Sequence, residues 1–431
     1  MKRKSVSLFL VVLLLFSLPA FSSGSAESGK AEDDIIEITY YDTLLTEKEA
    51  PMVKEMAAKY MELHPNVKIN QVGMPVNDMA KKITALAASG DLPDGFFMPS
   101  EFMGPAKEMG IILDPSPYLD AEWVDSVIDG CLEDATMEDQ LMFVPWHYIP
   151  QGIVYRKDWL KSEGLTSLET WEDFSKAAKA FTKDTNNDGR TDQWGFSMVS
   201  TRNGSGENRF IQWPRTWGVD EAVMEDGKWN LGFDEPGFED ALQYFVDLAL
   251  VDGVVPPGLT ETGYPEAAAY FAQEKTGLML TGSNALGAIL SDNPSLKGKL
   301  SSAPIPKKVR HVAPLQTSGI AITTSCEHPE VFADFLMFIT EEQIAVNFAL
   351  NSGRFPVIEE LAKNEAFADE MYQGFMNAAQ YAYPPQLFPG NGELLDICGE
   401  AYTTMLSGTS LEDAMETVLR RAEVLEDQYN K

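Results

Sequence analysis

Near the start of the chain, segments with the two-residue apolar period of a β-strand alternate with segments that have the apolar spacing of an α-helix. Residues 35–41 alternate apolar and polar side chains and are rich in isoleucine and tyrosine, which predicts a β-strand. Apolar side chains between 47 and 63 recur at helical spacing, and His64-Pro65 ends that pattern. The same periods predict strands at 67–72 and 95–98 and a helix at 76–88. This order of elements predicts a parallel α/β sheet.

The carboxyl ends of these strands carry side chains suited to ligand binding. In open α/β sheets, ligands bind beyond the carboxyl ends of the strands. The first predicted strand ends at Tyr41 and Asp42, and the third is followed by Glu101. We therefore expect Tyr41, Asp42 and Glu101 to lie in a binding site.

The stretch from Leu141 to Leu160 interrupts the sheet pattern. Two short strands are predicted in it, separated by Ile149-Pro150-Gln151. Proline lacks the backbone donor that a central strand needs, so this break predicts a chain that leaves one sheet and enters another. Trp146 and Tyr148 lie beside the break, and we expect them to form the floor of a cleft between two lobes.

The remainder of the chain repeats the α/β pattern and then becomes helical. The sequence from Thr170 to Asp173 resembles a capping box and predicts a helix at 171–181. From Pro329 onward nearly every segment predicts helix, with breaks near 351–356 and 383–390. No low-complexity linker separates these sections, which is typical of two lobes joined by several strand crossings.

Composition places the chain among soluble, exported proteins. A length of 431 residues with 44% hydrophobic and 23% charged residues predicts about two or three globular domains. A basic start, an apolar run and then small residues predict a secretory signal peptide that is removed within residues 1–26. The apolar run is too short to span a bilayer, and no cysteine near the cleavage region offers a lipid anchor. The net charge of -33 argues against nucleic-acid and anionic-membrane partners.

Enzyme motifs are missing from the sequence. It has no GxSxG, HExxH or GxxxxGK[ST] motif. The three cysteines, Cys131, Cys326 and Cys398, and the four histidines are scattered, so neither a redox pair nor a zinc site is predicted. One disulfide with a free thiol and three buried thiols both stay open. A pair of carboxylates could serve a glycosidase, but 66 acidic residues do not single out a pair.

Aromatic side chains gather in predicted loops and at predicted strand ends. Aromatic rings stack on the C–H faces of sugars, and neighbouring polar side chains bond to the hydroxyls, which is the usual composition of a small-molecule site. Packing in the core remains the alternative for each ring. Trp171 and Trp194 are assigned to the core, and the expected ligand contacts from loops are Asn203, Trp213, Trp217, Tyr264 and Phe388.

A polar loop at 184–192 has the spacing of a calcium-binding EF-hand loop. The possible ligands are Asp184, Asn186, Asp188, the carbonyl of Arg190, and Asp192. The twelfth position, where a bidentate glutamate is expected, holds Gly195. A polar turn without an ion therefore stays open as an alternative, and any calcium would be structural. No cofactor is required.

Several segments together resemble the extracellular solute-binding proteins of carbohydrate ABC importers, the family that includes maltose-binding protein. They cover almost all of the chain after the signal peptide. The segments are 35–42, 88–94, 144–158, 170–174, 277–283 and 353–357.

The resemblance implies the two-lobed α/β periplasmic-binding-protein fold, with hinge-linked lobes and a helical C-terminal section. Residues 31–145 and 304–350 would form the first lobe, and 151–300 and 354–431 the second. The crossings would lie near 145–151, 300–304 and 350–356. Matching positions place these residues at the ligand: Glu101, Trp146, Tyr148, Gln151, Ser283, Asn284 and Arg354.

The implied protein is a free periplasmic monomer that closes on a sugar and delivers it to the permease subunits of an ABC importer. Three alternatives remain. The ligand could be a polyol, a glycerol phosphate or a peptide. The protein could be an exported glycosidase. It could also be a sensor coupled to a chemoreceptor that binds without transport.

Overall fold

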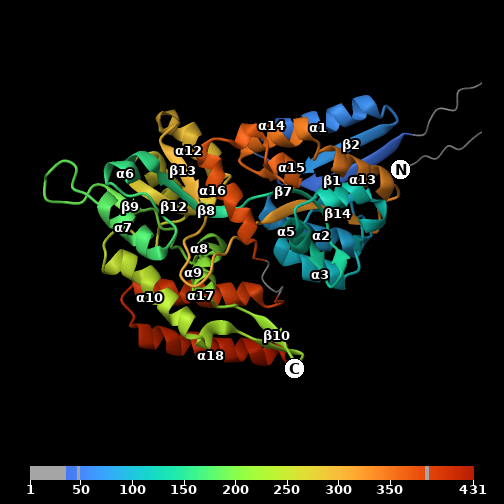
Figure 1. The fold of residues 1–431 in the computed structure, drawn as a ribbon. Coiled ribbons are helices and arrows are strands. Elements are labelled where there is room, and N and C mark those ends of the chain that lie inside the picture. Colours follow the sequence, from blue (N-terminus) through green and yellow to red (C-terminus); the bar gives the residue numbers. More distant parts are fainter. Residues whose placement is uncertain (1–34, 46–48, 384–387) are drawn as a thin grey trace, which may run out of the picture. The chain divides into compact units, whose positions relative to one another are not determined.

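Seven strands form the first sheet in the computed structural model of the chain (Figure 1). The structure describes residues 35–45, 49–383 and 388–431, without the side chains of Asn77 and Glu101. Ile36–Lys431 is a unit of its own, and the fold is described for it alone. The predicted signal peptide, residues 1–26, lies outside the described residues.

The first sheet has the strand order β15-β7-β14-β3-β1-β2, and β4 pairs with β14. β1, β2 and β3 are parallel, as the alternation of strands and helices predicts. Its strands are β1 Ile36–Asp42, β2 Val67–Gly73, β3 Gly95–Phe97, β4 Ile112–Leu113, β7 Val144–Tyr148, β14 Thr317–Thr323 and β15 Phe355–Pro356.

Helices cover both faces of the first sheet, and together they form the first lobe. One face packs Ile38 and Tyr40 against apolar residues of α1, α13 and α14. The other packs Phe96 against α2 and α3. The helices are α1 Glu49–Leu63, α2 Val76–Ser89, α3 Met103–Glu108, α4 Ala121–Ser126, α5 Asp129–Ala135, α13 Pro329–Phe338, α14 Glu342–Ser352 and α15 Glu359–Ala362, and a hairpin of β5 Thr136–Met137 and β6 Gln140–Leu141 follows α5.

The second sheet has four strands in the order β13-β8-β12-β9. They are β8 Gln151–Arg156, β9 Trp194–Phe196, β12 Thr276–Gly282 and β13 Leu300–Ala303. One face packs on the largest core, which includes Trp171, Trp213 and Tyr402. The other face packs Val154 and Met279 against α11, α12 and α16.

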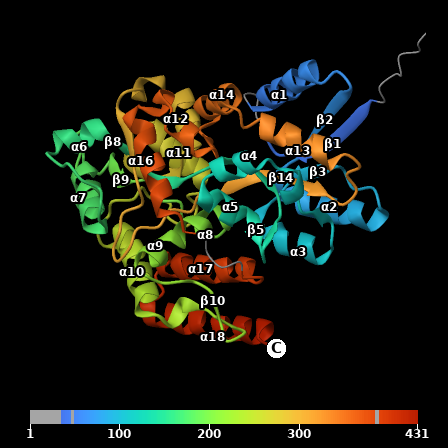
Figure 2. The same cartoon turned by 45° about the vertical axis from the view of Figure 1, so that its right-hand side comes forward.

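The second lobe contains the C-terminal helices, and α17 and α18 run side by side in it (Figures 1 and 2). Its helices are α6 Lys157–Ser162, α7 Trp171–Phe181, α8 Gly204–Phe210, α9 Gln212–Thr216, α10 Pro236–Leu250, α11 Tyr264–Ala272, α12 Ala285–Asp292, α16 Glu370–Ala378, α17 Asn391–Leu406 and α18 Leu411–Tyr429, and its hairpin is β10 Val223–Glu225 with β11 Lys228–Asn230. Short 3₁₀ turns are η1 Ser100–Phe102, η2 Ser116–Tyr118, η3 Gly232–Asp234, η4 Pro294–Leu296, η5 Glu365–Phe367 and η6 Ala379–Tyr381.

The second crossing differs from the prediction at 300–304. The chain leaves the second sheet after Ala303, but it enters the first sheet only at Thr317. Between these points Lys307 N donates to Glu169 O and Val309 N donates to Thr216 O, both at 2.9 Å. These hydrogen bonds hold the connecting segment on the second lobe, so the crossing lies later in the chain than predicted.

The third crossing also lies later than 350–356. β15 still pairs with β7 of the first sheet. The chain reaches the second lobe at α16, where Gly374 N and Phe375 N donate to Ser302 Oγ at 3.0 and 3.3 Å. No helix among the described residues is long and apolar enough to span a bilayer.

Candidate functional site

The first two crossings are hydrogen-bonded to each other. Ile149 N donates to Leu315 O at 2.8 Å, and Gln151 N donates to Pro314 O at 3.2 Å. Gln151 Nε2 also donates to Gln316 Oε1 at 2.8 Å. β15 pairs with the opposite edge of β7. The break around Pro150 is therefore a junction where three chain segments lie together.

Asp42 ends β1 with a carboxylate that is 0% exposed. Its Oδ1 accepts the N–H groups of Thr43 and Leu44 at 2.6 and 3.2 Å, and its Oδ2 accepts Gln71 Nε2 at 3.1 Å. Burial raises the pKa of Asp42 to about 6, although these hydrogen bonds and the positive charge of Arg354 act in the opposite direction. The carboxyl group therefore titrates close to neutral pH.

Arg354 approaches the same strand end from the turn between α14 and β15. Its Nε donates to Glu49 Oε1 at 3.0 Å, at the start of α1. Gly353 precedes it and ends α14 with a φ of 70°, a left-handed conformation that glycine adopts without strain. This turn brings the Arg354 guanidinium close enough to Asp42 for its charge to lower the Asp42 pKa.

Ser283 and Asn284 follow β12 and bring the second lobe to this junction. Ser283 Oγ donates to Gly353 O at 2.5 Å, and Ser283 N donates to Pro150 O at 3.2 Å. Ser283 is fully buried, and Asn284 is partly exposed. Asp42, Gln151, Ser283, Asn284 and Arg354 thus form one polar group at the crossings, which we call the crossing cluster.

A second polar group lies on α8, beside the carboxyl end of β12. Asn203 caps α8, and its side chain accepts Ser205 N and Gly206 N at 3.0 and 3.2 Å. The Arg209 guanidinium lies over the ring of Tyr264, 4.7 Å from its centroid. Arg209 Nε also donates to Leu280 O of β12 at 3.3 Å. Asn203 is exposed and Tyr264 is partly buried.

Four aromatic side chains that were expected at the cleft lie in cores instead. Trp213 is 1% exposed and stacks on Trp171 with ring centroids 3.9 Å apart. Trp146 is 2% exposed and stacks on Phe348. Tyr148 and Phe388 are also buried. Large rings gain most from complete removal from water, so in this conformation these side chains stabilise the lobes and do not face solvent.

The other predicted contacts are divided between surface and interior. Tyr41 is partly exposed at the end of β1. Trp217 is partly buried and lies 5.3 Å from Tyr244, ring centroid to ring centroid. Glu101 lies in η1, and its side chain is outside the described part of the chain.

In the polar loop at 184–192, carboxylates accept hydrogen bonds from N–H groups of the loop's own backbone. Asp184 accepts Gly189 N at 2.7 Å, and Asp192 accepts Thr185 N at 2.8 Å. The twelfth position has no space for a side chain, because a Cβ at Gly195 would lie 2.0 Å from Ala178 O. Across the described residues, no three His, Cys, Asp or Glu side chains are grouped to hold a metal ion. Calcium binding by this loop stays a prediction.

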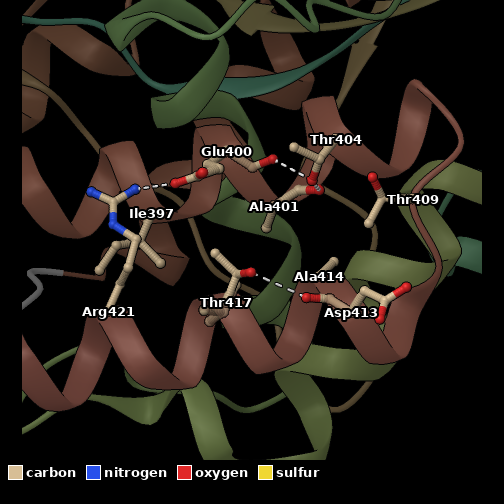
Figure 3. Close-up of a pocket in the computed structure, with 10 residues that line it drawn as sticks. Ile397, Glu400, Ala401, Thr404, Thr409, Asp413, Ala414, Thr417 and Arg421 are labelled. Atoms are coloured by element: carbon tan, nitrogen blue, oxygen red, sulfur yellow. Dashed lines mark hydrogen bonds and ion pairs between the residues drawn. The ribbon is translucent and has the colours of Figure 1, made fainter.

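A cavity of about 220 Å³ between α17 and α18 contains none of the predicted residues (Figure 3). Thr404 and Thr417 donate to carbonyls of their own helices, and Arg421 pairs with Glu400. A second cavity of about 500 Å³ lies on the first lobe near Tyr60 and Trp123. These polar groups of the first cavity already have partners, so they offer little to a ligand.

Sequence patterns did not identify several residues that support the site. They form side-chain hydrogen bonds with the predicted residues: Glu49 with Arg354, Gln71 with Asp42, and Gln316 with Gln151. Arg209 was also missed. Gln71 lies opposite Tyr40 in β2, so the predicted pairing of the first two strands could have identified it. The other three act through partners distant in sequence, which no local pattern reveals.

Comparison with solved structures places the fold among ABC transporter solute-binding proteins. The solute-binding protein of Thermotoga lettingae TMO, solved with α-D-tagatose, has a TM-score of 0.76 and 16% identity, with 90% of this chain and 100% of that chain covered. Maltose-bound MalE3 of T. maritima has a TM-score of 0.75 and 22% identity over the same shares. The chain therefore has the two-lobed fold with a helical C-terminal section.

Curated relatives match a smaller part of the chain than these solved structures do. Lipoprotein LipO of Bacillus subtilis is 26% identical over 260 residues, which are 58% of this chain and 50% of LipO. The polygalacturonan/rhamnogalacturonan-binding protein YtcQ of B. subtilis is 26% identical over 297 residues, 64% of this chain and 56% of YtcQ. The chain thus spans about half the length of the curated relatives it matches first.

A family model described as bacterial extracellular solute-binding protein matches residues 43–346, well over half of the chain. The match begins just after β1, which ends at Asp42, and it includes elements of both lobes and the first two crossings described above. The chain belongs to the bacterial extracellular solute-binding protein family.

Proposed function

We propose that the protein binds a saccharide between its two lobes and delivers it to the permease subunits of an ABC importer. The crossing cluster is the observation that carries this proposal. It brings a buried carboxylate, a guanidinium, a hydroxyl and a partly exposed amide to the point where both lobes meet. Such a mixture of donors and acceptors suits the hydroxyl groups of a sugar.

Each member of the cluster has a distinct role in this proposal. The Asp42 carboxylate accepts hydroxyl protons, and a ligand that donates to it stabilises its ionised form. Arg354 donates to ring or hydroxyl oxygens while Glu49 fixes its orientation. Asn284 offers both a donor and an acceptor from the second lobe. The remaining proposed contacts come from both lobes. The first lobe supplies Tyr41 and Glu101, and the second supplies Asn203, Trp217 and Tyr264.

Closure of the lobes follows from ligand contacts on both of them. A ligand that touches the first lobe at Asp42 and the second at Asn284 makes both sets of contacts only when the lobes are closed. It therefore shifts the population toward the closed state by its difference in affinity for the two states. The three crossings allow this motion while keeping the lobes connected.

The named ligands of similar proteins are all carbohydrates. They include tagatose, maltose and polygalacturonan or rhamnogalacturonan. They range from one sugar unit to a polymer, so they support a saccharide without fixing its length. Binding without catalysis is part of the proposal, as is export through a signal peptide to the periplasm. We also propose that the protein is a monomer, that it has no membrane anchor and that it does not bind nucleic acid.

The test is a thermal-shift panel of neutral and acidic mono- and oligosaccharides, with a polyol, a glycerol phosphate and a peptide as competing classes. A saccharide that stabilises the protein should raise the melting temperature and change tryptophan fluorescence on closure. Asn284→Ala should reduce that affinity without lowering the melting temperature of the free protein. Asn377→Ala, on an exposed position of α16, is the matched control and should bind normally. Stabilisation by another class alone, or by none, would contradict the proposal.

A further inference from the structure

Arg209 is a cation without a described acidic partner. It lies on α8, and its guanidinium is fixed from two sides. Nη1 donates to Ser205 O and Ser205 Oγ, both at 2.8 Å, and Nε donates to Leu280 O at 3.3 Å. Tyr264 stacks beneath it. All of these partners are neutral, so they orient the charge without neutralising it.

Other arginines of the described chain that are fixed by contacts have carboxylate partners. Ion pairs hold Arg156, Arg202, Arg215, Arg310, Arg354 and Arg421. Arg190 and Arg420 have none, but both are exposed to water. Arg209 is partly buried, and no ion pair within the described ranges includes it. Burial lowers the pKa of Arg209, but an arginine stays charged at neutral pH.

One edge of the guanidinium remains available. Nη2 has no acceptor within the described part of the chain, and it is not among the enclosed polar atoms that lack a partner. It is therefore open to solvent. A partly desolvated charge is costly when it is left unpaired, and an oriented N–H group is well suited to an anion.

The position of Arg209 connects it to the ligand site. Leu280, which accepts its Nε–H, is in β12, the strand that leads to Ser283 and Asn284 of the crossing cluster. Tyr264 begins α11 beside the same strand end. Ligands of α/β sheets bind at these carboxyl ends. Arg209 therefore lies where the second lobe would contact a ligand.

We infer that Arg209 binds an anionic group of the ligand, so that the preferred ligand is an acidic saccharide, with a carboxylate or a phosphate ester on the sugar. This inference rests on the proposed function. The Arg209 Nη2 N–H groups donate to the anion, Tyr264 holds the guanidinium plane, and the crossing cluster binds the hydroxyls. A neutral sugar would leave the charge of Arg209 unpaired when the lobes close over it.

The experiment compares matched sugars with and without an anionic group. Isothermal titration calorimetry measures digalacturonate against its dimethyl ester, and galactose 6-phosphate against galactose. For at least one pair we expect the acidic member to bind on the order of tenfold to a hundredfold more tightly, as is usual for a hydrogen-bonded ionic contact. The pair that shows this preference distinguishes carboxylate from phosphate.

Variants assign the preference to this residue. Arg209→Gln should remove most of the preference for the acidic member and leave the neutral member within about twofold. Arg209→Lys keeps the charge and should retain part of the preference. Arg420→Gln makes the same change in net charge on an exposed position of α18 and should leave the preference intact. Melting temperatures of the free variants show whether each one is folded.

The outcomes separate this inference from the proposed function. Equal binding of the acidic and neutral members, or an equal loss of the preference in Arg420→Gln, would overturn the role of Arg209 while saccharide binding stands. If neither member of either pair binds, and no sugar of the thermal-shift panel stabilises the protein, both fail. A preference that persists in folded Arg209→Gln would place the anion elsewhere.

Discussion

The aromatic core of the second lobe, from which Trp213 was expected to contact ligand, and the crossing cluster are built in opposite ways. Trp171 and Trp213 stack face to face and are almost fully removed from water. The crossing cluster consists of polar groups whose partners come from distant parts of the chain. The first arrangement stabilises one lobe, whereas the second connects the lobes and offers polar atoms to a ligand.

This contrast shows what an aromatic residue in a predicted loop can do. Trp213 belongs to a short helix, α9, which turns its ring toward α7 and α10. Burial of a large ring contributes to the core regardless of the chemistry of the site. Substitutions in the two regions should therefore separate loss of stability from loss of ligand affinity.

The largest expected effect is that of Trp213→Ala. It removes a fully buried indole and the stack on Trp171, which should lower the free energy of unfolding by about 3–5 kcal/mol. Urea unfolding followed by circular dichroism measures this loss. Trp213→Phe keeps an aromatic ring and should lose clearly less. If Trp213→Ala keeps its stability and loses ligand affinity, the ring is part of the site and the contrast is wrong.

Gly353→Ala should have the next largest effect, because it acts where the crossings meet. A Cβ there would lie 2.6 Å from Ser283 O and 2.8 Å from Asn284 Cα, and φ is already 70°. Strain and overpacking together should cost about 2–4 kcal/mol and weaken saccharide binding. Gly408→Ala is the control, since Gly408 has a positive φ but open space around it. Equal losses in the two variants would show that only the backbone conformation matters.

Local sequence patterns predicted most of the fold. The predicted helix 171–181 has these bounds in the structure, and Thr170 Oγ1 accepts Asp173 N at 3.1 Å as the capping pattern implies. Helix periods and caps depend on neighbours within a few residues, so one sequence suffices to see them. The second crossing was misplaced because the hydrogen bonds of Lys307 and Val309 to the second lobe join residues far apart in sequence.

The candidate site was only partly predictable for the same reason. The strand-end rule identified Asp42, and the family resemblance identified Gln151. Trp213 could not be separated from surface aromatics, because its burial depends on the packing of α7, α9 and α10. Arg209 is notable only for its lack of an acidic partner among the described residues, and that property requires coordinates.

Asp42 should give the crossing cluster a pH dependence that the aromatic core lacks. Its folded-state pKa is raised from 3.8 to about 6 by burial, so the folded protein binds this proton more tightly than the unfolded chain. Stability from this group is present below about pH 4 and is lost as pH rises through about 6, by about 2–3 kcal/mol in all. Asp42→Asn should remove this component.

Chemical denaturation of the wild type and Asp42→Asn from pH 4 to 8 measures that difference. The stability of the wild type relative to the variant should fall as pH rises. A constant difference would show that Asp42 titrates normally and is not desolvated. Saccharide affinity should also fall in Asp42→Asn at pH 7, since an amide replaces an acceptor with a donor.

The smallest expected effect concerns the side-chain bond between the first two crossings. Gln151→Ala and Gln316→Ala each remove one partner of the 2.8 Å hydrogen bond and should cost about 1 kcal/mol. In the double variant the losses should not add, and the double-mutant cycle then gives the coupling. Two backbone bonds also join these segments, so the fold should persist. Additive losses would mean that the side chains act independently, leaving the backbone pairing alone to align the crossings for closure.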